Sequence, residues 1–275
     1  MKGKLYVVAT PIGNLEDITL RAIRTLKEVD IIVAEDTRQT LKLLNHLEIS
    51  KPLISYHRHN EEIKVESLIE KILQGNNIAL VSDAGTPVIS DPGEVIVREA
   101  IKSDIDIIPI PGACALINGL IASGLDAKEF VFLGFLSLNK KIRKEKIEEI
   151  ENESRTIILY EAPHKILNTL DDLKSVLKDR KVVLARELTK IHEEFIRGTV
   201  KEILEKYKEP RGEHIIIIEG NSNKKSDIQN DLLNAMPVEQ HYKYYEQQGF
   251  TKNEIIKKVA KDRNVNKNEI YKLFV

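Results

Sequence analysis

The stretch ALVSDAGTPVISDPG, Ala79 to Gly93, decides the fold. It begins in an apolar run, breaks into a loop with two prolines, two glycines and two aspartates, and is followed from Glu94 by an amphipathic run. A strand, a loop and a helix in this order form the ligand crevice of open α/β sheets. The loop nevertheless lacks GxGxxG, GxxxxGKS and GxxxxGKT, the glycine-rich sequences that bind phosphate groups.

The same order of elements repeats along the first part of the chain. We predict strands at 5–9, 31–34, 53–55, 78–81 and 105–110, with helices at 17–28, 38–47, 61–73 and 94–102. Apolar residues at helical spacing, such as Ile18, Ala22 and Leu26, support the helices. Apolar strands separated by helices indicate a mostly parallel sheet that is covered on both faces.

A second set of apolar runs predicts strands at 130–135, 156–160, 182–185 and 215–218, with helices at 140–150, 164–177 and 200–207. Alternation within 187–199 indicates a hairpin, so the second sheet is less clearly parallel. The fold class is therefore α/β, and we predict two α/β domains, at 1–118 and 119–222. The polar stretch 221–230 predicts a linker.

The segment 232–275 has a different character, with three short predicted helices and breaks at Gly249 and at 264–266. From Met236 to Val275 it contains eight Lys or Arg against five Asp or Glu. A short helix, a turn and a second helix indicate a helix-turn-helix-like module that contacts RNA, and the alternative is a packing appendage.

Composition restricts the class of protein. The chain has 275 residues, a net charge of −1 and one cysteine, Cys114, so it can form no internal disulfide and no cysteine-cluster metal site. No apolar run approaches the roughly 18 residues of a membrane span, and the run at 5–9 is interpreted as a strand and not as an export signal. We expect a cytoplasmic protein with no membrane partner.

The loops that follow the first five strands are dense in glycine, proline, asparagine and aspartate, which can simply make turns. The loop Ser82–Gly93, however, has two aspartates and no Lys or Arg, which argues against a bare polyphosphate ligand. It suits a ligand with hydroxyls, an amine or a positive centre. S-adenosylmethionine has all three, and Asp83 can accept a hydrogen bond from any of them.

Seven sequences in order carry a resemblance to a known family: ATPIGNLEDIT, AEDTRQT, YHRHNE, SDAGTPVISDPG, PIPGACA, YEAPHKI and ARELTKIHEEFIRGT. Over about residues 1–220 the chain resembles the tetrapyrrole-methylase-like superfamily of S-adenosylmethionine-dependent methyltransferases. Within it, the chain is similar to the bacterial enzymes that methylate the 2′-hydroxyl of a cytidine in the decoding region of 16S rRNA. The resemblance implies a cofactor in the cleft between two α/β domains, a homodimer, and 16S rRNA or the small ribosomal subunit as partner.

The resemblance also implies which residues bind the cofactor. Cys114 stands where the family commonly has Ser, which puts a hydroxyl hydrogen bond there in doubt. The implied cofactor residues are Pro11, Asp83, Ala84, Gly85, Thr86, Ile89, Cys114, Ala115, Tyr160, Arg186, Glu187, Leu188, Gly212 and Glu213.

A ribose hydroxyl is a poor nucleophile, so a base or cation near it would help. We predict catalytic roles for Glu161, Arg186, Glu187 and Lys190, with structural ion pairs as the alternative. His164 and the group Glu35, Asp36, Thr37 and Arg38 are further candidates for the base. An enzyme that works mainly by aligning donor and acceptor needs no base.

Local cations are predicted to bind RNA phosphates. The candidates are Arg38, His57, Arg58, Lys257, Lys258, Lys261 and Arg263. The basic run at 140–146 can be interpreted equally well as an RNA-binding segment or as the solvated face of a helix. We predict no metal site, since His57 and His59 have no further ligand cluster. Two other functions stay open: methylation of a tetrapyrrole or other small molecule, and a non-catalytic ribosome-associated binding protein.

Overall fold

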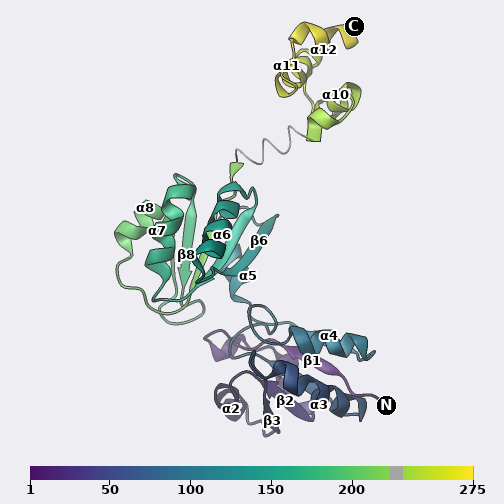
Figure 1. Cartoon of the computed structure of the whole chain (residues 1–275), viewed down its shortest axis with the longest axis vertical. Coiled ribbons are helices and arrows are strands. Elements are labelled where there is room, and N and C mark those ends of the chain that lie inside the picture. Colours follow the sequence, from purple (N-terminus) through teal and green to yellow (C-terminus); the bar gives the residue numbers. More distant parts are fainter. Residues whose placement is uncertain (223–231, 275) are drawn as a thin grey trace.

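The computed structural model describes residues 1–222 and 232–274. The predicted linker at 221–230 lies almost wholly outside the described residues. Figure 1 shows two α/β lobes connected through α5 (Ala115–Ser123), and a separate group of helices at the C-terminal end of the chain. No helix in the described ranges is both long enough and apolar enough to cross a membrane.

The first sheet is parallel throughout and has the order β3-β2-β4-β1-β5. Its strands are β1 (Leu5–Val8), β2 (Ile31–Ala34), β3 (Leu53–Ser55), β4 (Ile78–Val81) and β5 (Ile107–Ile110). The connecting helices are α1 (Leu20–Glu28), α2 (Thr37–His46), α3 (Glu61–Leu73) and α4 (Glu94–Lys102), after a 3-10 turn η1 (Leu15–Asp17). The predicted parallel sheet is confirmed.

Strand alternation divides the core of this sheet between its two faces. Ile78 and Leu80 of β4 pack with α3 and α4, whereas Ala79 and Val81 pack with α1 and α2. Both faces are therefore buried, which explains why β4 is apolar at every position. Because all five strands run in one direction, the loops that follow them converge at one edge.

The second sheet is mixed and has the order β6-β7-β10-β8-β9. Only β6 and β7 are parallel, and β8 and β9 form the predicted hairpin. The strands are β6 (Phe130–Phe135), β7 (Thr156–Glu161), β8 (Val182–Arg186), β9 (Glu194–Gly198) and β10 (His214–Ile218). Helices α6 (Lys140–Asn152), α7 (Ile166–Leu177) and α8 (Val200–Lys206) pack on one face.

Helix α5 packs on the other face of the second sheet. Its buried residues Leu116 and Leu120 join a cluster with Ile158 and Ile215. The domain division predicted between residues 118 and 119 stays a prediction, and it falls inside this helix.

The C-terminal module, which we define as residues 232–274, has its own apolar core. Helices α10 (Val238–Glu246), α11 (Lys252–Asp262) and α12 (Lys267–Leu273) bury Ile255, Ile256, Val259 and Ile270 among themselves (Figure 1). The module therefore has a hydrophobic core independent of the two α/β domains.

Candidate active site

A pocket of about 410 Å³ lies where the strand-end loops of the first sheet face the second domain. This volume is in the range of small-molecule sites. Its lining combines loops from both domains: Ile12, Glu35, Asp83, Ala84, Gly85, Thr86, Ile89, Ser90, Asp91, Cys114, Ala115, Phe135, Tyr160, Glu161, Ala162, Pro163, Glu187, Leu188, Lys190, Glu213, His214 and Ile215.

The acidic loop, residues 82–93, forms the wall on the first domain and is fixed at several points. Gly85 exchanges two backbone hydrogen bonds with Thr10, of 2.8 and 3.1 Å. Thr86 Oγ1 donates to the carbonyl of Ala113 at 3.1 Å. Val88 and Ser90 have φ angles of 76° and 68°, a region that costs a side-chain-bearing residue free energy. Such strain concentrates at ligand sites.

Gly85 also keeps the pocket wall close to the first strand's loop. Its φ is +82°, and a Cβ there would lie 3.0 Å from Ile12 Cγ2. A larger residue would be strained and would push Ile12 away from the pocket. The position therefore requires glycine.

Three carboxylates gather on this wall. Burial, followed by the charges of Glu35 and Asp83, raises the pKa of Asp91 to about 6. Burial, followed by the charge of Asp83, also raises the pKa of Glu35. Asp83 Oδ1 accepts a hydrogen bond from the backbone N–H of Asp36 at 2.9 Å. Asp83 thus ties the acidic loop to the loop after β2 and contributes negative charge to the pocket.

The wall on the second domain is formed by the ends of β7 and β10 and by the loop after β8. Tyr160 Oη accepts a hydrogen bond from the N–H of Leu116 at 3.0 Å, which links β7 to the first turn of α5. Burial raises the pKa of Tyr160, so the phenol stays protonated. Cys114 is the N-cap residue of α5 and makes no side-chain cap hydrogen bond. The Tyr160 hydroxyl therefore satisfies an N–H that a serine at 114 would otherwise serve.

Glu187 and Lys190 form an ion pair at the pocket, with Lys190 Nζ 2.9 Å from Glu187 Oε1. Glu187 has a φ of 50°, and a Cβ on Gly212 would lie 1.9 Å from its Oε1. Gly212 is thus the residue that makes room for the Glu187 carboxylate. The Lys190 side chain crosses to the first domain, since a Cβ on Gly13 would lie 2.5 Å from its Cγ.

Two predicted catalytic residues, Glu161 and Arg186, lie on the helix-covered side of the second sheet. Alternation along β7 and β8 places them with Leu159 and Leu184, which pack under the helices. Glu161 is 3% exposed. Its oxygens accept hydrogen bonds from the Ala162 N–H at 2.9 Å and from Thr169 Oγ1 at 2.6 Å. Its carboxylate is therefore occupied by the protein.

Arg186 lies apart from the pocket. Its Nε donates to Glu194 Oε2 at 2.6 Å, and its guanidinium sits 5.5 Å from the centroid of the Tyr207 ring. It lines a different groove beside β9 and α8. Pro11 and Gly212 do not line the pocket themselves but adjoin residues that do.

The remaining predicted cofactor residues all come together in the pocket: Asp83, Ala84, Gly85, Thr86, Ile89, Cys114, Ala115, Tyr160, Glu187, Leu188 and Glu213. Sequence reasoning assigned no cofactor or catalytic role to nine lining residues, although it weighed Glu35 as a base: Ile12, Glu35, Ser90, Asp91, Phe135, Ala162, Pro163, His214 and Ile215. Ser90 and Asp91 belong to the opening stretch, so their loop position was a usable signal. Phe135 had no such signal.

The predicted RNA-binding residues of the first domain make local contacts. Arg38 forms two hydrogen bonds to Asp36, of 3.0 and 2.7 Å, and this pairing lowers the pKa of Asp36 to about 2. Arg58 donates to the carbonyl of Ser90 in the acidic loop. The His57 ring lies edge-on to His59, with centroids 6.0 Å apart. In the described ranges no group of three or more His, Cys, Asp or Glu is arranged to hold a metal ion.

The predicted RNA-binding residues of the C-terminal module separate into two kinds. Lys257 and Lys261 are exposed on α11. Lys258 Nζ instead lies 4.4 Å from the centroid of the Phe250 ring. Arg263 donates to His241 Nδ1 at 3.1 Å and to the carbonyls of Leu233 and Met236. Arg263 therefore holds the module together.

Comparison with known proteins places this geometry in a family. Residues 4–204 match the family model for tetrapyrrole (corrin/porphyrin) methylases. A protein of Halalkalibacterium halodurans named ribosomal RNA small subunit methyltransferase I is 51% identical over 275 residues, 99% of this chain and 95% of that protein. Proteins of the same name from Bacillus subtilis and Escherichia coli O157:H7 are 48% and 46% identical, over 98% and 86% of this chain and 93% and 85% of theirs.

Solved structures agree at the level of the fold. A diphthine synthase superposes with a TM-score of 0.60 at 16% identity, over 78% of this chain and 89% of that one. A uroporphyrin-III-C-methyltransferase from Thermus thermophilus gives 0.56 at 18% identity, over 79% and 94%. With a family match over most of its length and close relatives along the whole chain, this protein belongs to the tetrapyrrole (corrin/porphyrin) methylase family.

Proposed function

We propose that the chain transfers a methyl group from S-adenosylmethionine to the ribose 2′-hydroxyl of a cytidine in the decoding region of 16S rRNA. Support comes from the relatives named ribosomal RNA small subunit methyltransferase I, which align with nearly the whole chain, C-terminal module included. A small-molecule methylase would leave that basic module unexplained.

S-adenosylmethionine, the methyl donor of this family, fits the charge of the pocket. The described lining contains six carboxylic acids: Glu35, Asp83, Asp91, Glu161, Glu187 and Glu213. It contains one lysine, Lys190, which is paired with Glu187. Burial lowers the pKa of His214 to about 4, so its ring is neutral at physiological pH. Such a lining favours a cationic ligand and disfavours phosphate groups.

When bound, S-adenosylmethionine supplies an electrophilic methyl group on a positively charged sulfur. Asp83 and Asp91 of the acidic loop, together with Glu35, would hold the cationic and hydroxyl-bearing parts of the cofactor. Ala84, Gly85, Cys114 and Ala115 would bring backbone close to it. Displacement at a methyl group depends mainly on alignment of donor and acceptor, which two rigid walls from two domains provide.

Of the four predicted catalytic residues, we retain Glu187 and Lys190 for the ribose hydroxyl. They line the pocket as a pair, and Lys190 also contacts the first domain at Gly13. The Lys190 ammonium can stabilise negative charge on the attacking oxygen, and Glu187 can orient that oxygen. Glu161 and Arg186 would act on the structure of the second domain instead.

The assembly and location follow from the same proposal. We propose a cytoplasmic homodimer whose macromolecular partner is 16S rRNA or the small ribosomal subunit. Lys257 and Lys261 of the C-terminal module would contact RNA phosphates.

The proposal is tested by deleting the gene and measuring the nucleosides of 16S rRNA by mass spectrometry. The 2′-O-methylated cytidine should disappear and should return when the wild-type gene is supplied on a plasmid. Supplying a Lys190→Ala variant should restore it poorly. Persistence of the methylated cytidine after deletion would refute the proposal and favour the small-molecule or non-catalytic alternatives.

A further inference from the structure

Phe135 is an exposed aromatic residue at the pocket. It lines the pocket at the end of β6, yet 56% of its surface is exposed. Its ring meets the Tyr160 ring edge-on, with centroids 5.7 Å apart and planes at 61°. Tyr160 thus supports the ring on one side, while much of its surface remains open to an incoming group.

A β-bulge directs Phe135 into the pocket. The register of β6 against β7 shifts between Phe132, which pairs with Ile158, and Gly134, which pairs with Leu159. Leu133 is the extra residue, and it packs with the helices on the far face. Phe135 therefore pairs with Tyr160 on the α5 side of the sheet. In unbroken alternation Phe135 would oppose Glu161 and lie under the helices.

The bulge lies directly against the acidic loop. Gly134 has a φ of +64°, and a Cβ there would come 3.8 Å from Ser90 Oγ. The end of β6 therefore meets the acidic loop, and Phe135 lines the same pocket as Ser90 and Asp91. Bulges beside active sites commonly redirect a side chain. Here the extra residue Leu133 moves Phe135 from the helix-covered face of the sheet to the face that borders the pocket.

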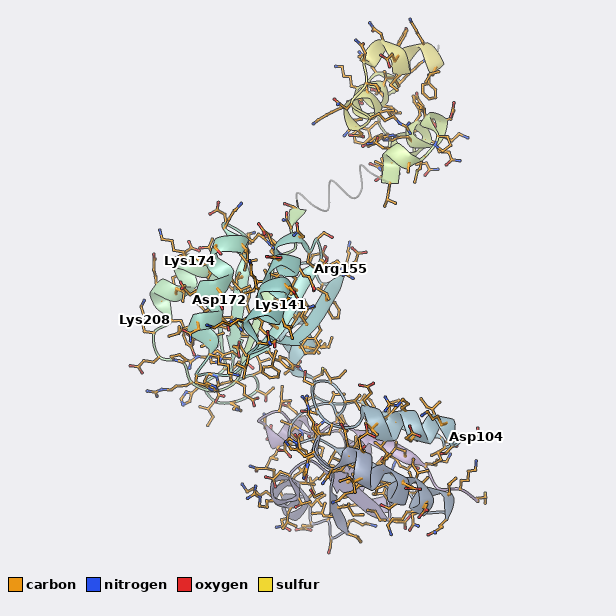
Figure 2. The ribbon with its side chains drawn as sticks, in the orientation of Figure 1. Asp104, Lys141, Arg155, Asp172, Lys174 and Lys208 are labelled. Atoms are coloured by element: carbon orange, nitrogen blue, oxygen red, sulfur yellow. The ribbon has the colours of Figure 1, made fainter. Side chains whose placement is uncertain are left out.

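The charges around Phe135 decide which part of an RNA can reach it. The pocket carboxylates repel phosphates, so the phosphodiester backbone stays outside. Lys140 and Lys141, five and six residues further along, are exposed at the start of α6. Figure 2 shows Lys141 on α6. Arg143, by contrast, is bound to Asp172 and Thr169 at 2.8 and 2.9 Å. Lys140 and Lys141 are therefore exposed cations on the helix that follows β6.

We propose that Phe135 is the stacking platform for the base of the target cytidine, turned out of the RNA so that its ribose reaches the pocket. The inference rests on the proposed function and adds the residue that holds the base. Enzymes that modify a nucleotide commonly extrude it and stack its base on an aromatic side chain. An exposed ring at the mouth of an acidic pocket provides that surface.

The test uses the full chain and small ribosomal subunits isolated from the deletion strain, with methyl-tritiated S-adenosylmethionine. Phe135→Leu keeps an apolar side chain but removes the aromatic face. It should lower kcat/KM for the subunit about ten- to a hundredfold, the loss expected for one stacked base. Phe135→Tyr should restore most of the rate. The affinity for S-adenosylhomocysteine by calorimetry and the thermal midpoint should change little in either variant.

Ile101→Ala is the matched control, because Ile101 is an exposed apolar residue of α4 that does not line the pocket. It should leave kcat/KM unchanged. Wild-type rates in Phe135→Leu, or an equal loss in Phe135→Tyr, would overturn the inference while leaving the proposed function intact. Loss of cofactor affinity in parallel with the rate would assign Phe135 to the cofactor wall instead. No methyl transfer by the wild-type chain would refute the proposed function and, with it, this role.

Discussion

At the scale of single residues, Asp91 shows that the pocket is assembled at a cost in stability. A carboxyl with an ordinary pKa of 3.8 that is raised to about 6 on folding holds a proton in the folded state that the unfolded state has released. Stability therefore falls as pH rises from about 4 to 6, and the full cost is present above pH 6. Two pKa units correspond to about 3 kcal/mol, which screening at this half-buried site reduces to about 1 kcal/mol.

We accordingly expect Asp91→Asn to raise the free energy of unfolding by about 1 kcal/mol at pH 8 and to leave it unchanged at pH 4. Urea unfolding at the two pH values measures the difference. Asp104→Asn, which alters a fully exposed carboxylate labelled in Figure 2, is the control. An equal increase in the free energy of unfolding at both pH values would show that ionisation of Asp91 does not cause the stabilisation.

At the scale of elements, the start of α5 joins the two domains and the pocket. The Leu116 N–H is bound by Tyr160 Oη, and Cys114 caps nothing. Tyr160→Phe should therefore cost about 1 kcal/mol of unfolding free energy. Cys114→Ser should add about 0.5–1 kcal/mol, since serine is a preferred N-cap residue. In the Cys114→Ser background the loss from Tyr160→Phe should shrink, because the serine Oγ can accept from the same N–H. Equal losses in both backgrounds, measured by urea unfolding, would contradict this account.

Periodicity predicted most elements because burial on one or two faces leaves a direct pattern in the sequence. Ile78–Val81 is apolar throughout and is a central strand buried on both sides. Side-chain direction at strand ends was harder to predict. The motifs placed Glu161 and Arg186 in loops that do reach the pocket, but strand alternation turns both side chains toward the helices. The bulge at Leu133 reverses the face of Phe135, and only the neighbouring Gly134 hints at it.

At the scale of the whole molecule, the proposed function divides between the pocket and the C-terminal module. The pocket is acidic and suits a cation, whereas the module carries its exposed lysines on helices with a core of their own. In that core His241 is fully buried and burial lowers its pKa. Because Arg263 can only donate, His241 Nδ1 must accept, so the ring proton is on Nε2 and faces Asp262 at 3.3 Å. The module's fold thus depends on Arg263, and its contacts with RNA would depend on other residues.

Removal of residues 232–275 should therefore impair methylation of small ribosomal subunits far more than cofactor binding. The double variant Lys257→Ala/Lys261→Ala should reproduce part of the loss. It should also reduce the slope of log K for subunit binding against log salt concentration by about 1.5, as expected when two phosphate contacts are lost.

Arg263→Ala should instead lower the thermal stability of the module, because it leaves the Leu233 and Met236 carbonyls and the buried Nδ1 of His241 without a hydrogen-bond donor. Filter binding at salt concentrations on the order of 50 to 300 mM measures subunit binding. Calorimetry with S-adenosylhomocysteine measures cofactor binding, so the two effects are separated. If truncation weakened cofactor and subunit binding equally, the module would be a structural support of the α/β domains and not an RNA-binding element.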